Sequence, residues 1–164
     1  MAAGITYEPI ATNTLSSTAS SVTFSSISGS YTDLVLVSNG KMSAGSAVNN
    51  KITFNSDTTT NYSRTYVYGD GSTALSGRDS SQDNLGFIYW NSTNPSTTII
   101  QIQNYSNTTT YKTALARTSE SGVAVAYVGL WRSTSAITNI TITRGSTNDF
   151  ASGSTFTLYG IKAA

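Results

Sequence analysis

The chain has 164 residues with 9 basic and 8 acidic side chains, a net charge of +1, and neither histidine nor cysteine. Disulfides, thiolate nucleophiles and imidazole bases are therefore excluded, and with them Ser-His-Asp and Cys-His catalysis within one chain. The small net charge argues against nucleic acid as the main partner, because proteins that bind it usually carry a basic face. An apolar run of about 18 residues, the length of a spanning helix, is missing, so we expect no membrane segment. We also expect no signal peptide, because the first residues lack a basic start and an apolar core.

The predicted strands come at a spacing of roughly 10–14 residues, and no segment has helical periodicity. In chain order they cover residues 5–11, 21–27, 32–38, 51–55, 64–68, 85–90, 97–105, 111–118, 122–132, 137–144 and 154–163. Residues 69–84 are expected to form a long loop with at most a short strand near residues 74–75. This pattern predicts an all-β fold, an antiparallel, jelly-roll-like β-sandwich of about ten short strands, with an up-and-down barrel as the alternative.

Serine and threonine number 27 each, which is 54 of 164 residues. A disordered stalk is not expected, because 38% of the residues are hydrophobic and the net charge is small. Threonine is β-branched and suits an exposed strand face. We therefore interpret the hydroxyl-rich composition as the solvent face of a sheet protein.

The organisation is that of one domain, because no linker or change in composition divides the chain. Pro9 removes a backbone donor, so residues 1–12 are predicted to form an N-terminal arm or an edge strand. Residues 13–164 are predicted to form a single β-sandwich domain.

The last predicted strand carries apolar residues on both faces, with Phe156 and Leu158 on one side and Tyr159 and Ile161 on the other. Only one face of a strand in a two-layer sandwich meets the core. Trp131, after a long apolar run, raises the same question. We therefore predict an oligomer interface that includes Trp131, Tyr159 and Ile161.

Catalytic chemistry is not expected from this sequence. The eight acidic residues form no pair in an apolar setting of the kind that glycoside hydrolysis requires. A calcium site built from Asp70, Asp79 and Asp83 is a minor alternative, because these residues lack the D-x-[DN]-x-[DN]-G spacing. The prediction is a non-enzymatic protein without catalytic residues, cofactor or metal.

Tyrosine is the commonest aromatic residue, with 10 copies against five phenylalanines and two tryptophans. A tyrosine ring contributes apolar area and keeps a polar tip, which suits interfaces and sugar-stacking surfaces. Tyr66, Tyr68, Tyr89 and Trp90 are candidates for a glycan-binding surface. The alternative is that each of them lies half-buried at the end of a sheet.

Three segments carry a resemblance to a known group of proteins: ITYEPIATNTLSS, VTFSSISGSYTDLVLVS and DFASGSTFTLYGIKAA. Together they resemble small β-rich virion surface proteins of tailed bacteriophages, of the head decoration (cement) or fibre-tip type. The resemblance covers both ends of the chain and thins out between residues 40 and 120. It implies a jelly-roll-like sandwich, trimeric assembly and a place on the outside of the particle.

Two functions follow from this resemblance. The first is a capsid decoration protein on the outer surface of the head, which binds the major capsid protein and itself, as a homo-oligomer that is expected to be a trimer. Its capsid-contact arm is predicted to include Ile5, Tyr7, Pro9 and Ile10, which would add to a neighbouring sheet edge. The second is a receptor-binding fibre or knob domain that recognises host surface glycan.

Overall fold

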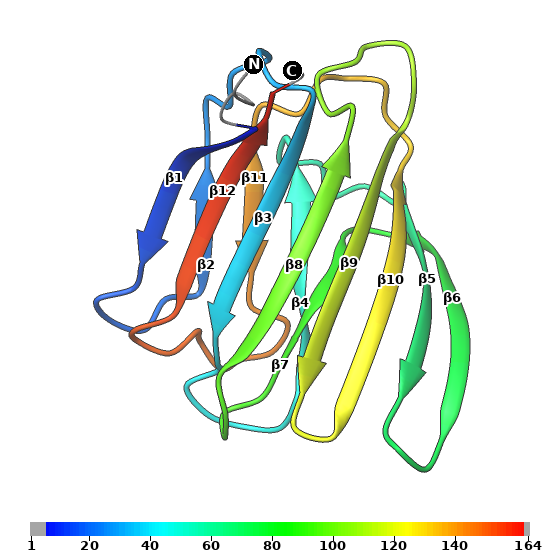
Figure 1. Cartoon of the computed structure of the whole chain (residues 1–164). Helices are drawn as coiled ribbons and strands as arrows, with labels where there is room; N and C mark the ends of the chain where they lie inside the picture. Colours follow the sequence, from blue (N-terminus) through cyan, green and yellow to red (C-terminus); the bar gives the residue numbers. More distant parts are fainter. Residues whose placement is uncertain (1–5, 163–164) are drawn as a thin grey trace, which may run out of the picture.

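Two antiparallel β-sheets face each other in the computed structural model, which describes residues 6–162 (Figure 1). The strands of this part of the chain are β1 (Tyr7–Thr14), β2 (Ser21–Phe24), β3 (Asp33–Gly40), β4 (Val48–Phe54), β5 (Tyr62–Gly69), β6 (Ala74–Gln82), β7 (Leu85–Trp90), β8 (Ser96–Gln103), β9 (Lys112–Glu120), β10 (Val123–Trp131), β11 (Ile140–Thr143) and β12 (Thr155–Ile161). The large sheet has the order β1-β12-β3-β8-β9-β10-β5-β6, and the small sheet has the order β2-β11-β4-β7. The predicted antiparallel β-sandwich is therefore confirmed. The described residues contain no helix of the length and hydropathy that crossing a membrane requires.

The core lies between the two sheets and is built from residues at alternating strand positions. Successive side chains of a strand point to opposite faces, so every second residue can leave water on the inner side. The core of the sandwich includes Val22, Phe24, Leu34, Leu36, Ile52, Phe54, Ile100, Ile102, Ile140, Ile142, Phe156 and Leu158. The last strand has the two faces that its sequence predicts, with Phe156 and Leu158 in the core and Tyr159 and Ile161 on the other side.

Consecutive strands alternate between the sheets, except at β5–β6, β8–β9 and β9–β10, where both strands belong to the large sheet. The strands β1, β3, β8 and β12 belong to the large sheet, and β2, β4, β7 and β11 belong to the small one. The hairpins β5–β6 and β9–β10 both join the large sheet and double its width. As a result β5 and β6 lie beyond the small sheet, at the right of Figure 1.

The first strand is an edge strand and not a free arm. β1 pairs with β12 from Tyr7 opposite Ile161 to Thr14 opposite Thr155, with a β-bulge between Pro9 and Ala11. Of the two alternatives for residues 1–12, the described part thus adopts the edge strand, which continues to Thr14.

The predicted long loop over residues 69–84 is wrong, because most of it forms the edge strand β6. This strand pairs with β5 from Gly69 opposite Ala74 to Tyr62 opposite Gln82. Most side chains of β6 are exposed, and its sequence lacks the alternation of apolar and polar residues that marks a half-buried strand. The turn predicted at residues 69–71 is present, and it is held by Asp70 Oδ1, which accepts the backbone N–H of Thr73 at 2.6 Å.

Candidate functional site

A pocket of about 210 Å³ opens between the sheets where the large sheet extends past the small one. We call it the tyrosine pocket. It is lined by Asn49 of β4, Arg64, Tyr66 and Tyr68 of β5, Tyr89 of β7, and Val125 and Tyr127 of β10.

The pairing of β5 with β10 places two of these tyrosines side by side. Tyr66 lies opposite Tyr127 and Tyr68 lies opposite Val125, and directly opposed residues share a face of the sheet. Tyr127 and Val125 are 4% and 5% exposed and form the floor, while Tyr66 and Tyr68 are half-buried at the rim. The pocket thus has an aromatic floor and an accessible aromatic rim.

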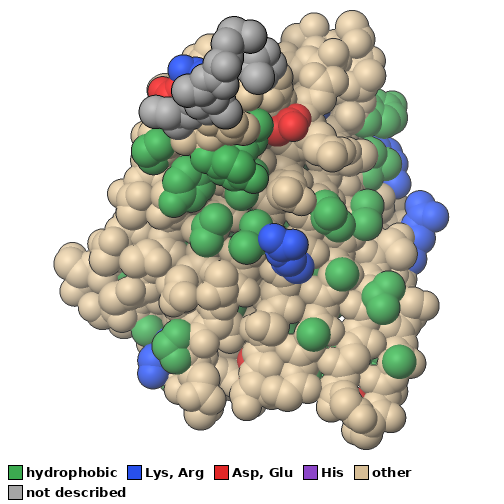
Figure 2. Space-filling view, viewed as in Figure 1, with side chains coloured by type: hydrophobic (Ala, Val, Ile, Leu, Met, Phe, Trp, Pro, Cys, Tyr) green, Lys and Arg blue, Asp and Glu red, His purple; other side chains and the backbone are tan. Residues whose placement is uncertain are grey.

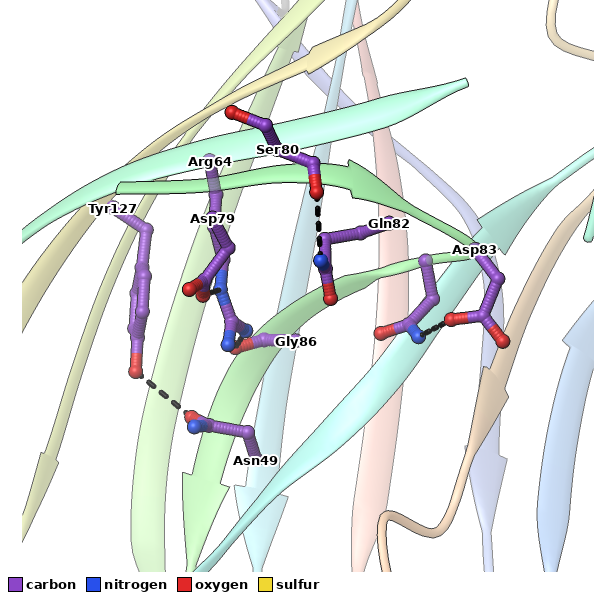
Figure 3. Close-up of polar contacts among 9 residues, drawn as sticks. Asn49, Arg64, Asp79, Ser80, Gln82, Asp83, Gly86 and Tyr127 are labelled. Atoms are coloured by element: carbon purple, nitrogen blue, oxygen red, sulfur yellow. Dashed lines mark hydrogen bonds and ion pairs between the residues drawn. The ribbon is translucent and has the colours of Figure 1, made fainter. Parts of the chain in front are cut away.

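Tyr127 is fixed in place by three neighbours. Its hydroxyl donates to Asn49 Oδ1 at 2.8 Å, which leaves the Asn49 amide nitrogen as a donor at the pocket (Figure 3). Its ring stacks on Phe87, with centroids 5.3 Å apart, and meets the Tyr66 ring at 6.0 Å. These contacts hold the floor in one orientation before any ligand arrives.

The one cationic side chain of the pocket lining is already paired. Arg64 Nε donates to Asp79 Oδ2 at 2.7 Å, and Nη1 donates to the carbonyl of Gly86 at 2.6 Å (Figure 3). The Arg64 guanidinium also lies over the Tyr127 ring, 5.6 Å from its centroid. The pocket therefore presents little net charge to a ligand.

Burial raises the pKa of two tyrosine hydroxyls of the pocket. It raises the pKa of Tyr127 to about 12, although the nearby Arg64 charge acts in the opposite direction. Burial also raises the pKa of Tyr89, and the neighbouring Tyr68 and Glu120 add to the effect. Both groups are neutral hydroxyls at physiological pH and can donate or accept hydrogen bonds.

Three of the four residues predicted as a glycan surface come together here, and the fourth does not. Tyr66, Tyr68 and Tyr89 line the tyrosine pocket. Trp90 is 0% exposed and packs against Phe150 and Phe156. Its inclusion was wrong because Tyr89 and Trp90 are consecutive in β7 and must point to opposite faces.

Sequence reasoning missed Asn49, Arg64, Val125 and Tyr127. Arg64 could have been found, because it lies two residues before Tyr66 and every second residue of a strand points to the same face. The other three belong to β4 and β10, and no local pattern reveals that β10 pairs with β5 across the intervening chain.

The outer face of the large sheet is a second candidate surface, and it is unusually apolar. The outer apolar face, as we call it, consists of Val67, Ile99, Leu115, Ala126 and Val128. Val67, Leu115 and Val128 are among the most exposed large hydrophobic residues described, at 61%, 47% and 56%. A shallow depression of about 200 Å³ lies between β8, β9 and β10, with the charged Arg117 at its side.

The apolar surface continues at the edge of the sheet in a group that we call the β1–β12 corner. It comprises Tyr7, Pro9, Tyr159 and Ile161, with the rings of Tyr7 and Tyr159 edge to face at 6.4 Å. Figure 2 shows hydrophobic side chains gathered at its upper left, over β1 and β12, and smaller spots across the rest of the face.

The corner joins two surfaces that the sequence analysis treated separately. Tyr7 and Pro9 were assigned to a capsid-contact arm, and Tyr159 and Ile161 to an oligomer interface. Ile10 is half-buried and packs against the core, so it contributes little to the exposed corner. Ile5 lies outside the described residues.

Trp131 is not available for an oligomer interface. It is 2% exposed, and its Nε1 donates to Asp57 Oδ2 at 2.7 Å. Its ring stacks on Tyr62, with centroids 6.2 Å apart. It occupies an inward position of β10, where burial alternates strictly, and a lone tryptophan after an apolar run gives no sign of its side.

The three aspartates considered for a calcium site each have a different partner. Asp70 holds a turn, Asp79 pairs with Arg64, and Asp83 accepts from Asn84. Within residues 6–162 no three histidine, cysteine or acidic residues are grouped so as to hold a metal ion.

Comparison of the chain with family models, with curated proteins and with solved structures found no match.

Proposed function

We propose that this chain is a non-enzymatic structural protein of a bacteriophage virion, a decoration protein on the outer surface of the capsid that acts as a homotrimer. The observation that carries the proposal is the apolar character of the large sheet on the side away from the core. Assembly of copies around a threefold axis would bury the outer apolar face, and the β1–β12 corner would contact the major capsid protein.

The two sheets differ on their outer sides, and this contrast supports assembly. On the small sheet the outward positions hold Thr23, Lys51, Thr53, Thr141 and Thr143, the pattern of an antiparallel sheet that faces water. The large sheet presents valine, isoleucine, leucine and tyrosine at many of the equivalent positions, with Thr65, Gln101 and Arg117 between them. Exposed apolar side chains gathered on one face mark interaction sites on soluble proteins.

The segments that resemble phage virion proteins support the assignment of the corner to the capsid. They supply β1, β3 and β12, which are neighbours in the large sheet, and most of β2 in the small sheet. Segments at opposite ends of the sequence thus build one continuous surface, and the corner belongs to it.

The strand order supports the finer fold assignment that we propose, a jelly roll. Without the hairpins β5–β6 and β9–β10, eight strands remain, four in each sheet, and they keep the orders β1-β12-β3-β8 and β2-β11-β4-β7. Jelly rolls are eight-stranded double sheets found in viral capsid and lectin domains. Fold alone does not give function, so this argument is secondary to the surface.

The trimer is tested by analytical ultracentrifugation at micromolar concentration. We expect the unaltered protein to sediment as a trimer and the double variant Leu115→Lys/Val128→Lys to sediment as a monomer. The matched control, Thr141→Lys/Thr143→Lys, places two lysines on the outer side of the small sheet and should remain trimeric. A stable monomer of the unaltered protein would overturn the trimer.

Capsid attachment is tested on virions of the phage that encodes the chain, produced with Tyr159→Lys/Ile161→Lys. Electron microscopy of unaltered particles should show density of this protein at lattice positions of the head, and the variant should leave those positions empty while still forming trimers in solution. Density confined to the tail fibres would refute capsid decoration and favour the fibre-tip function.

A further inference from the structure

We infer that the tyrosine pocket binds one ring of an uncharged saccharide. This inference does not depend on the proposed virion function, because it rests only on the residues that line the pocket. The pocket lies at the β5–β10 side of the large sheet, and the β1–β12 corner lies at its opposite edge, so both sites can be occupied at once.

The size of the pocket limits the ligand. Pockets for drug-sized molecules usually enclose about 300–1,000 Å³. At about 210 Å³ the tyrosine pocket suits one small ring, and the half-buried rim allows the rest of a longer chain to extend into solvent.

The pocket offers no unpaired charge, so an ionic ligand fits it less well than a neutral one. The Arg64 guanidinium is engaged by the Asp79 carboxylate and the Gly86 carbonyl, so an anionic ligand would have to compete with an existing ion pair. No acidic side chain lines the pocket, so a cation gains no opposite charge there.

The chemistry of the lining matches a sugar ring on both of its sides. The apolar C–H face of a pyranose packs on aromatic rings, and Tyr66, Tyr68 and Tyr89 supply such rings at the rim. Their hydroxyls and the Asn49 amide nitrogen can exchange hydrogen bonds with sugar hydroxyls. A few convergent polar groups in an otherwise apolar cleft are typical of small-molecule sites.

The pocket is also organised in advance, which lowers the cost of ordering side chains on binding. Tyr127 is held by Phe87 and Asn49, and Arg64 is held by two hydrogen bonds. Only the half-buried rim tyrosines need to adjust.

The test is titration of the ¹⁵N-labelled full chain with neutral methyl glycosides of glucose, galactose, mannose and N-acetylglucosamine, followed by NMR. We expect at least one of them to shift the amide signals of β5, β7 and β10 around the pocket, with a millimolar dissociation constant. Glucuronic acid, the anionic comparison, should bind more weakly than the neutral sugar of the same shape.

Three variants distinguish the loss of stacking between the Tyr89 ring and the sugar from a general change in the fold. Tyr89→Ala should weaken binding of that glycoside at least about tenfold, which is 1.4 kcal/mol, and Tyr89→Phe should retain most of it because the ring remains. Tyr111→Ala removes a more exposed tyrosine, in the loop before β9 and outside the pocket, and should leave affinity unchanged.

Three outcomes would overturn the inference: no pocket shifts with any of the neutral glycosides, shifts confined to other surfaces, or equal losses in Tyr89→Ala and Tyr111→Ala. None of them affects the virion proposal, because the pocket variants leave the outer apolar face and the β1–β12 corner intact.

Discussion

Threonine has two distinct roles at the residue scale. On exposed faces threonines pair across strands, as Thr12 and Thr157 do at 3.1 Å. The composition led us to expect only this solvent-facing role. Thr98 and Thr118, however, lie on the inner side of the large sheet, 0% and 5% exposed, and their hydroxyls bond to each other at 2.7 Å.

This buried hydroxyl pair gives a prediction with an internal control. Thr98→Val leaves the Thr118 hydroxyl buried without its partner, which costs about 1–3 kcal/mol. The double change Thr98→Val/Thr118→Val removes both polar groups and should return the stability close to the original value. Urea unfolding of the two single variants and the double variant measures the coupling; additive losses would contradict a pairwise bond.

Asp57 is an acidic residue whose ionised form is stabilised by the fold. Burial acts to raise its pKa, but hydrogen bonds from Thr59, Asn61 and Trp131 outweigh burial and hold the pKa well below its usual range. Because the folded-state pKa is depressed, this stabilisation is complete above the unfolded pKa of about 4. It is lost as the pH falls from there through the folded pKa.

Asp57→Asn should therefore reduce the free energy of unfolding at neutral pH by about 1–3 kcal/mol. It should also make the decline of stability below about pH 4 shallower than in the unaltered protein. Chemical denaturation at a series of pH values provides both quantities. Asp83→Asn, at an exposed position, is the control and should change neither; an unaltered acid profile in Asp57→Asn would refute the assignment.

At the scale of elements, the contact between β10 and β7 requires a residue without a side chain. Gly129 of β10 faces β7, and a Cβ added there would lie 2.7 Å from Leu85 Cδ2 and closer still to the Phe87 ring. Both neighbours are fully buried and have no room to withdraw. This glycine therefore lets the β9–β10 hairpin approach the small sheet.

Gly129→Ala should lower the midpoint of thermal unfolding, because overpacking of a core costs about 1–3 kcal/mol. Gly69→Ala is the matched control: Gly69 lies in the adjacent strand β5, and an added Cβ would meet nothing within 4 Å. It should be neutral or slightly stabilising. Equal destabilisation by both changes would contradict a specific role for the contact between Gly129 and β7.

The elements differ in how well the sequence predicts them, and burial explains the difference. β12 and β11 alternate apolar and polar residues because one face of each meets the core, and both were predicted. β6 lies at an edge and buries little, so no pattern marked it. The tyrosine pocket was predicted only in part, because its walls come from β4, β5, β7 and β10, whose pairing depends on contacts between distant segments.

The two sides of the whole molecule differ, and each carries one of the two proposed binding sites. The edge formed by β1, β12 and β3 comes from the segments that resemble virion proteins. The opposite side carries the tyrosine pocket, and five of its seven lining residues lie between residues 40 and 120, where that resemblance thins out. This arrangement suits a protein that attaches by one edge and presents a binding site at the other.

The proposed trimerisation would couple this arrangement to the stability of the whole molecule. If only the folded chain associates, mass action makes the thermal midpoint rise with protein concentration. We therefore expect the midpoint of the unaltered protein to increase over about a hundredfold range of concentration, measured by scanning calorimetry. Leu115→Lys/Val128→Lys should melt at a lower temperature that does not depend on concentration, because the lysines prevent association without entering the core. The tyrosine pocket variants should keep the concentration dependence of the unaltered chain. A midpoint independent of concentration in the unaltered protein would show that the outer apolar face is not buried between copies.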